Sequence, residues 1–257
     1  MPVLHSKIIG SGDNHFIIFH GFLGMGENWK THAKNLAEKC YCVHLVDQRN
    51  HGRSFWSEDF DYDVMVEDLH LYLNHHNLKE VIVLGHSMGG KTGMGFALKY
   101  PDRVKKLIIA DIGPKYYAPQ HQKILAGLST LNFSDINSRK VAAEHLANYI
   151  PDMGTRQFLL KNLYWVSHGQ LGLRPNIAVL KNAAEAIGTA IESDSSFLKP
   201  VLFLYGGNSN YINPDIDTPM ILDYFPKAKL IEIKNAGHWL HAEKPQQFFE
   251  ILIKWLP

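Results

Sequence analysis

The stretch Gly85-His86-Ser87-Met88-Gly89 is the most informative part of this chain, because of the residues on either side of it. The four residues before it, Val81-Ile82-Val83-Leu84, are apolar and mostly β-branched, as expected of a buried strand. The small and apolar residues at 90–100 are typical of a helix, which Pro101 ends. A serine between glycines, at a sharp turn from a strand into a helix, is the pattern of a nucleophile elbow. We therefore predict that Ser87 is a catalytic nucleophile.

A serine hydroxyl needs a base to take its proton, and the best-placed base in the sequence is His238. It follows the strand-like run 229–233 and precedes the last helix, predicted at about 245–256. In chains with this elbow the order is serine, acid, histidine, and the histidine comes after the last strand. The chain has 15 histidines, and His241 also lies close to this motif. His86, beside the serine, is expected to be a packing residue.

Two positions compete for the carboxylate that orients the histidine. The usual one is the turn after the next-to-last strand, but residues 206–210 read Gly-Gly-Asn-Ser-Asn, and Asp215 and Asp217 lie farther along the loop. The other is Asp111, directly after the predicted strand 106–110. That strand should neighbour the one before the elbow, about 4.8 Å away, with both carboxyl ends at the same edge. The sequence therefore favours Asp111 as the acid.

An oxyanion hole requires two backbone N–H groups that face the developing charge. One should come from Met88, which follows the nucleophile at the start of a helix, where the helix dipole also favours negative charge. The other should come from the loop 20–24, which reads His-Gly-Phe-Leu-Gly after the predicted strand 16–19. Its position in this loop makes Phe22 the expected donor.

Apolar runs of strand length alternate with helical patterns over most of the chain. Strands are predicted at 16–19, 40–46, 81–84, 104–110, 201–205 and 230–233, with an antiparallel edge strand at about 3–9. Helices are predicted near 29–39, 64–75, 89–99 and 245–256. This alternation indicates an α/β fold with a mostly parallel, doubly wound sheet.

Between about 115 and 196 the alternation stops. Four helices are predicted there instead, at about 120–128, 138–149, 155–164 and 176–187. We therefore expect a core of residues 1–114 and 197–257, with residues 115–196, here called the cap segment, inserted as a helical cap or lid. Open α/β sheets bind ligands at the carboxyl ends of their strands, which such a cap would cover. Apolar residues indicate an acyl pocket, with expected lining residues Phe158, Leu159, Trp165 and Trp239.

Charged residues near these motifs are expected to be structural. Asp47 and Arg49 follow a predicted strand and should brace the loop beside the site. Lys91 lies one helical turn past the nucleophile, and we expect it to hold the loop of Asp111 by its charge.

Taken together, these residues resemble the α/β-hydrolase superfamily over essentially the whole chain. More narrowly, the chain is similar to YbfF-type bacterial esterases and the related abhydrolase-domain proteins of mitochondria. The segments that carry this similarity are Asn50-His51, Lys91, Asp111-Ile112-Gly113-Pro114, residues 156–163, Gly206-Gly207-Asn208-Ser209 and Ala236-Gly237-His238-Trp239. The resemblance implies a serine esterase that acts on acyl esters or acyl thioesters without a cofactor, and no metal is predicted. It supports Asp111 as the acid and implies that Ser209 is an additional member of the site.

Composition limits the partners and the compartment. The 26 basic and 25 acidic residues leave a net charge of +1, so no binding to nucleic acid or to an anionic membrane is expected. The first seven residues lack a signal-peptide core, and no apolar stretch is long enough to span a membrane. Cys40 and Cys42 are the only cysteines and are not expected to bridge each other, which favours a reducing, cytoplasmic location.

The predicted reaction is acyl transfer in two steps, with a small-molecule ester or thioester as substrate and Ser87, His238 and Asp111 as the catalytic triad. Two alternatives remain, because a fold does not decide a function. One is a carbon–carbon bond hydrolase or a perhydrolase that uses the same triad. The other is a ligand receptor that keeps the hydrolase fold, which turnover of simple esters would exclude.

Overall fold

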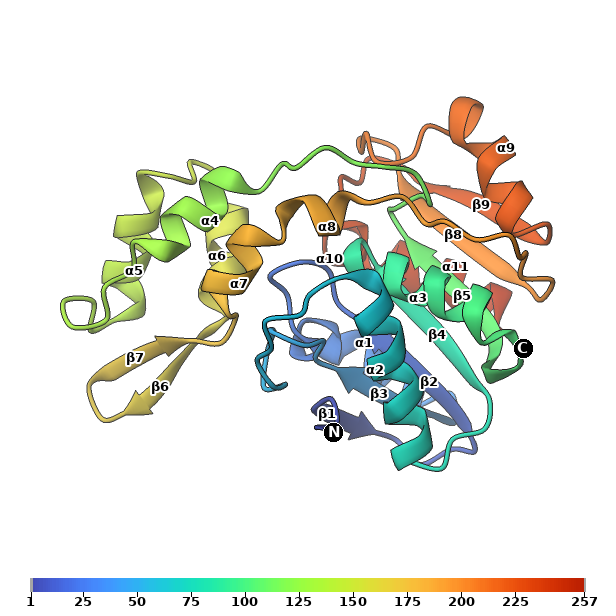
Figure 1. Ribbon diagram of the computed structural model, residues 1–257, viewed down its shortest axis with the longest axis horizontal. Coiled ribbons are helices and arrows are strands. Elements are labelled where there is room, and N and C mark those ends of the chain that lie inside the picture. Colours follow the sequence, from blue (N-terminus) through green and yellow to red (C-terminus); the bar gives the residue numbers. More distant parts are fainter. Residues whose placement is uncertain (1, 257) are drawn as a thin grey trace.

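Seven strands form the central sheet of the protein, which a computed structural model describes for residues 2–256 (Figure 1). In order across the sheet they are β1 Ser6–Ile9, β3 Tyr41–Val46, β2 Asn14–Phe19, β4 Val81–His86, β5 Val104–Ala110, β8 Val201–Gly206 and β9 Ala228–Ile233. Only the edge strand β1 pairs antiparallel, and the other pairs within this sheet are parallel. Every residue of β3 and β4 is buried, which explains why apolar residues occupy successive positions there. The predicted mostly parallel sheet is confirmed.

Helices cover both faces of the sheet. One face packs against α2 Tyr62–His75, α3 Met88–Lys99 and α9 Pro214–Tyr224, and the other against α1 Lys30–Ala37, α10 Leu240–Glu243 and α11 Pro245–Trp255. Alternate residues of each strand enter the two cores: Ile17 and Phe19 lie on the α3 side, whereas Phe16 and Ile18 lie on the α11 side. Short 3₁₀ turns at Gly26–Trp29 and Pro101–Arg103 complete this part.

The cap segment lies to one side of the sheet (Figure 1). Its buried apolar residues form a third cluster, which also contains Phe22, Leu23, Phe60, Tyr62, Met65 and Met88 from outside the segment. It contains α4 Gln122–Ser129, α5 Arg139–Ala147, α6 Met153–Leu160, the hairpin of β6 Leu163–Ser167 and β7 Gln170–Leu173, and then α7 Ile177–Asn182 and α8 Ala184–Gly188. The helix predicted at 155–164 is therefore wrong beyond residue 160. There the aromatic and β-branched residues 164–166 form a strand, and Gly169, at φ 78°, allows the tight turn. The division into core and cap at residues 114 and 197 stays a prediction.

Two further sequence expectations concern the compartment. Within residues 2–256, no helix is long and apolar enough to cross a membrane. Both cysteines are free thiols: Cys40 is exposed just before β3, and Cys42 is buried within that strand.

Candidate active site

Ser87 occupies the turn between β4 and α3 in a conformation that few residues other than glycine adopt. Its φ is 52° and its ψ is −119°, and its N–H donates to the carbonyl oxygen of Ala110 at 3.0 Å. The flanking glycines are required by close contacts: a Cβ on Gly85 would lie 2.1 Å from the carbonyl oxygen of Gly89, and one on Gly89 would lie 2.6 Å from that of His20. The turn therefore presents the serine at the carboxyl end of β4.

Asp111 lies at the end of the neighbouring strand, β5, and its side chain is 0% exposed. Its carboxylate accepts hydrogen bonds from the N–H of Gly206 at 2.9 Å, from the hydroxyl of Ser209, and from Nδ1 of His238 at 2.8 Å. Because the carboxylate only accepts, His238 donates from Nδ1, and its Nε2 is left with a lone pair. A histidine held in this way can take a proton from a nucleophile.

The competing carboxylates have other partners. Asp217 is buried, and its carboxylate binds the ammonium of Lys115 at 2.6 Å and the N–H of Asn213 at 2.8 Å. Asp215 is exposed in the first turn of α9. Both carboxylates thus belong to the start of α9, and the histidine contact belongs to Asp111.

Two aromatic residues position His238. Tyr211 stacks on its ring, with the ring centroids 3.7 Å apart and the planes at 13°. His86 donates from Nε2 to the backbone carbonyl of His238 at 2.9 Å, and burial lowers the pKa of His86 well below 6.5, so its ring is neutral. Sequence reasoning missed Tyr211, which follows the polar turn 206–210, and gave His86 only a packing role.

The loop after β2 passes directly against the nucleophile, since a Cβ on Gly21 would lie 3.3 Å from the Cβ of Ser87. His20 controls this loop: its Nδ1 donates to the carbonyl of Gly21 at 2.8 Å, and its Nε2 accepts from the N–H of Gln48 at 3.0 Å. Burial lowers the pKa of His20 to about 4, which keeps this arrangement neutral. In a trans peptide the C=O and the following N–H point in opposite directions, so a fixed Gly21 carbonyl also fixes the N–H of Phe22.

Met88, the other expected oxyanion donor, is the first residue of α3. The first N–H groups of a helix have no partner within the helix, so this one can bind an anion. The structure thus places both Phe22 and Met88 beside the nucleophile. Phe22 lines one of the two pockets that Ser87 also lines, and Met88 lines the other.

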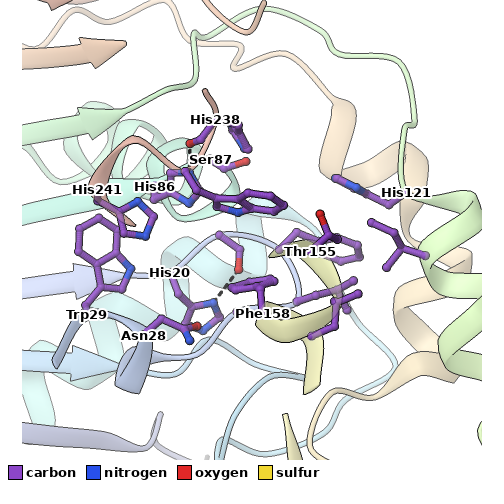
Figure 2. Close-up of a pocket in the computed structure, with 17 residues that line it drawn as sticks. His20, Asn28, Trp29, His86, Ser87, His121, Thr155, Phe158, His238 and His241 are labelled. Carbon is purple, nitrogen blue, oxygen red and sulfur yellow. Dashed lines mark hydrogen bonds between the residues drawn. The ribbon is translucent and has the colours of Figure 1, made fainter. Parts of the chain in front are cut away.

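Ser87 lies between two pockets. The first, shown in Figure 2, is lined by the loop after β2, by α6 and by the residues after His238, and it includes Phe158, Leu159 and Trp239 as expected. The second lies under the ends of the cap segment, and its lining residues include Tyr62, Tyr117, Ile187 and Tyr211. His121, which the sequence did not indicate, lines both pockets, and burial lowers its pKa to about 4.

The predicted pocket position of Trp165 is wrong. This side chain is 54% exposed on β6, where it lines a surface groove with Arg139 and Lys161. The reason is the change from helix to hairpin after residue 160, because alternate residues of a strand point to opposite faces and the hairpin extends away from the sheet (Figure 1).

Lys91 also has a role other than the one expected. It is 0% exposed, and its ammonium donates to the carbonyl of Gly188 at 3.1 Å and to that of Thr189, near the end of the cap segment. No carboxylate of the Asp111 loop is among these partners; the ammonium lies 5.0 Å from the ring centroid of Tyr117, which follows that loop. Burial lowers the pKa of Lys91 to about 8. Lys91 therefore ties α3 to α8.

The acidic and basic residues after β3 brace loops, as expected. Arg49 forms a two-point ion pair with Asp68, at 2.6 and 2.9 Å. Asp47 accepts from the N–H groups of Gly26 at 2.7 Å and Arg53 at 2.9 Å.

Comparison with known proteins gives a consistent result. The family model described as "alpha/beta hydrolase fold" matches residues 14–245. The chain is 34% identical to the mouse sn-1-specific diacylglycerol lipase ABHD11, over 100% of this chain and 85% of the relative. It is 32% identical to esterase YbfF of Escherichia coli, over 93% of this chain and 92% of the relative. A solved structure titled "Marine microorganism esterase" superimposes with a TM-score of 0.95 at 40% identity, covering 100% of both chains.

These similarities confirm the predicted family resemblance and the predicted esterase type of enzyme. They also agree with the parallel sheet and with the elbow that follows β4. The chain belongs to the alpha/beta hydrolase fold family.

Proposed function

We propose that this protein hydrolyses carboxylic esters through an acyl-enzyme intermediate, with Ser87 as nucleophile, His238 as base and Asp111 as the acid that orients the histidine. The observation that carries the proposal is the 2.8 Å hydrogen bond from His238 Nδ1 to a fully buried carboxylate. Together with the strained turn at Ser87, it supports the assignment of His238 as the base for this serine.

In the first step, Ser87 Oγ attacks the carbonyl carbon of the ester while His238 Nε2 takes the hydroxyl proton. The N–H groups of Phe22 and Met88 stabilise the negative charge on the carbonyl oxygen. When the intermediate collapses, the bond to the alcohol oxygen breaks, and His238 gives its proton to that oxygen. The products of this step are a free alcohol and an acyl group on Ser87.

In the second step, water attacks the acyl carbon and His238 takes a proton from the water. Collapse of the new intermediate breaks the bond to Ser87 Oγ, and His238 returns the proton to the serine. Throughout, the carboxylate of Asp111 stabilises the imidazolium that forms twice in each cycle. The hydroxyl of Ser209 and the N–H of Gly206 hold that carboxylate in place.

The pockets favour an uncharged, apolar ester. Aromatic and aliphatic side chains such as Phe158, Leu159 and Trp239 suit an acyl chain, and the second pocket provides room for the alcohol. Neither described pocket has a lysine or an arginine in its lining, so phosphates of a coenzyme A thioester would lack a partner there. The mouse relative named as a diacylglycerol lipase makes glycerol esters the first natural class to test.

The test uses p-nitrophenyl esters of graded chain length, monoacyl and diacyl glycerols, a short acyl thioester and acyl-coenzyme A. We expect many turnovers of the uncharged esters, and a fluorophosphonate should add one mass increment to the peptide that contains Ser87. Ser87→Ala should lose about 10⁶ in kcat, as in subtilisin, whereas the exposed control Ser196→Ala should keep full activity. Label on another residue would contradict the assignment, and binding without turnover would favour a receptor.

A further inference from the structure

A histidine–cysteine cluster lies at the amino end of the sheet. In the register of β2 and β3, His15 is paired with Cys42, and His44 is two residues farther along β3, on the same face as Cys42. The distance from His15 Nδ1 to His44 Nε2 is 3.0 Å, and that from Cys42 Sγ to His44 Nε2 is 3.8 Å. Among residues 2–256 this is the group of His, Cys, Asp or Glu side chains whose ligand atoms converge, all within 4.8 Å of one another.

Two of the three separations suit a tetrahedral zinc ion. With Zn–N bonds of about 2.0 Å and a Zn–S bond of about 2.3 Å, two nitrogen ligands lie about 3.3 Å apart, and a nitrogen and a sulfur ligand about 3.5 Å apart. Both observed distances are within a few tenths of an ångström of these values. Two imidazoles and a thiolate are also the ligand types that zinc selects.

A hydrogen bond outside the cluster orients His44 for binding a metal. Tyr72 donates its hydroxyl proton to Ser6 Oγ at 2.7 Å, so its oxygen is free to accept from His44 Nδ1, also at 2.7 Å. The lone pair of His44 is therefore on Nε2, which faces His15 and Cys42. A histidine that binds a metal usually has its second nitrogen engaged in this way.

We propose that His15 Nδ1, Cys42 Sγ and His44 Nε2 bind one Zn²⁺ ion, with a water molecule as fourth ligand. Binding releases the thiol proton of Cys42, because the thiolate is the ligand. His15 is only half-buried, which gives the ion a route from solvent. A hydrogen bond between neutral His15 and His44 would explain their contact, but not the convergence of the third ligand, Cys42.

The proposed ion has a structural role and takes no part in ester hydrolysis. The cluster lies at the amino ends of β2 and β3, whereas Ser87, Asp111 and His238 follow the carboxyl ends of strands in the same sheet. It would hold β2 and β3 together, and β2 leads into the loop 20–24, which contains Phe22.

The experiment is a titration of the full-length protein, freed of metal with a chelator, first with Co²⁺ and then with Zn²⁺. We expect one equivalent of Co²⁺ to produce a thiolate-to-cobalt charge-transfer band, which Zn²⁺ displaces. Cys42→Ser should abolish the band, and the matched control Cys40→Ser, at the exposed thiol, should retain it. Tyr72→Phe, which removes the acceptor for His44, should weaken Zn²⁺ binding by about 10- to 100-fold.

Esterase activity and circular dichroism of each variant test whether it is folded. If Cys42→Ser does not fold, the half-buried His15→Asn provides the second test, with Zn²⁺ affinity at least about tenfold weaker. A parent protein without the charge-transfer band, or variants that bind Zn²⁺ as tightly as the parent, would overturn the proposal. Either outcome leaves the proposed esterase function untouched.

Discussion

Replacing Asp111 by asparagine tests the proposed triad most directly, because the surroundings of Asp111 dictate how the new amide must point. The N–H of Gly206 lies 2.9 Å from one carboxylate oxygen and requires an acceptor there. The amide oxygen of the asparagine therefore takes that position, and its NH₂ group faces Ser209 and His238. The opposite orientation would place two donors against each other in a site that is 0% exposed.

With an NH₂ group 2.8 Å from His238 Nδ1, that nitrogen must accept, so the ring proton moves to Nε2. The histidine then cannot take the proton of Ser87, and the imidazolium loses its counter-charge. The corresponding change in a serine protease lowers kcat by about 10⁴, or about 5.4 kcal/mol in activation free energy. We expect a loss of this size for Asp111→Asn, with KM changed only slightly.

The assay measures steady-state hydrolysis of a short p-nitrophenyl ester and the rate of labelling by a fluorophosphonate. Asp215→Asn is the matched control, because that carboxylate is exposed and should change activity by only a few-fold. Asp217→Asn breaks the ion pair with Lys115 and should lower stability more than kcat. The reasoning is refuted if Asp111→Asn stays within tenfold of the parent while Asp217→Asn, still folded, loses its activity.

Three other changes have distinct expected results. Ser209→Ala removes a hydroxyl donor to the Asp111 carboxylate and should lower kcat by about 10- to 150-fold, since a hydrogen bond to a charged group contributes about 1.5–3 kcal/mol. An unchanged kcat would exclude Ser209 from the site. Phe158→Ala should shift the preference among acyl chain lengths, whereas the control Trp165→Ala, at an exposed position, should not. An equal loss of activity at every chain length would mean that Phe158 contributes to stability alone. Lys91→Met probes the buried ammonium, whose pKa is about 8 when folded against about 10.4 in an unfolded chain. Between pH 8 and 10 the unfolded parent protein binds more protons than the folded parent protein. The unfolding free energy of the parent, measured by urea titration, should therefore rise relative to that of the Met variant by about 1.4 kcal/mol per pH unit. A difference in unfolding free energy that does not change with pH would contradict this.

Much of the fold could be predicted from local patterns. The alternation of strand-length apolar runs with helical segments led to the parallel sheet, because buried parallel strands leave a continuous apolar signal. The elbow was evident because glycines are needed at both close contacts around Ser87. The cap segment is harder to predict, because its short elements have weak periodicity, and the helix predicted at 155–164 runs into the first two residues of the β6–β7 hairpin.

Within the site, the sequence by itself determined which residue types are present and at which strand ends they lie. Ser87, Asp111 and His238 each follow a strand, and parallel strands end at a common edge. Only the tertiary structure decided which of them meet. The pairing of His86 with Ala110 places β5 beside β4, and the fold directs Asp217 to Lys115 and Asp111 to His238. The cluster of His15, Cys42 and His44 likewise depends on the register between β2 and β3. No spacing along the chain encodes that register, because packing of the whole sheet fixes how two strands far apart in sequence are paired.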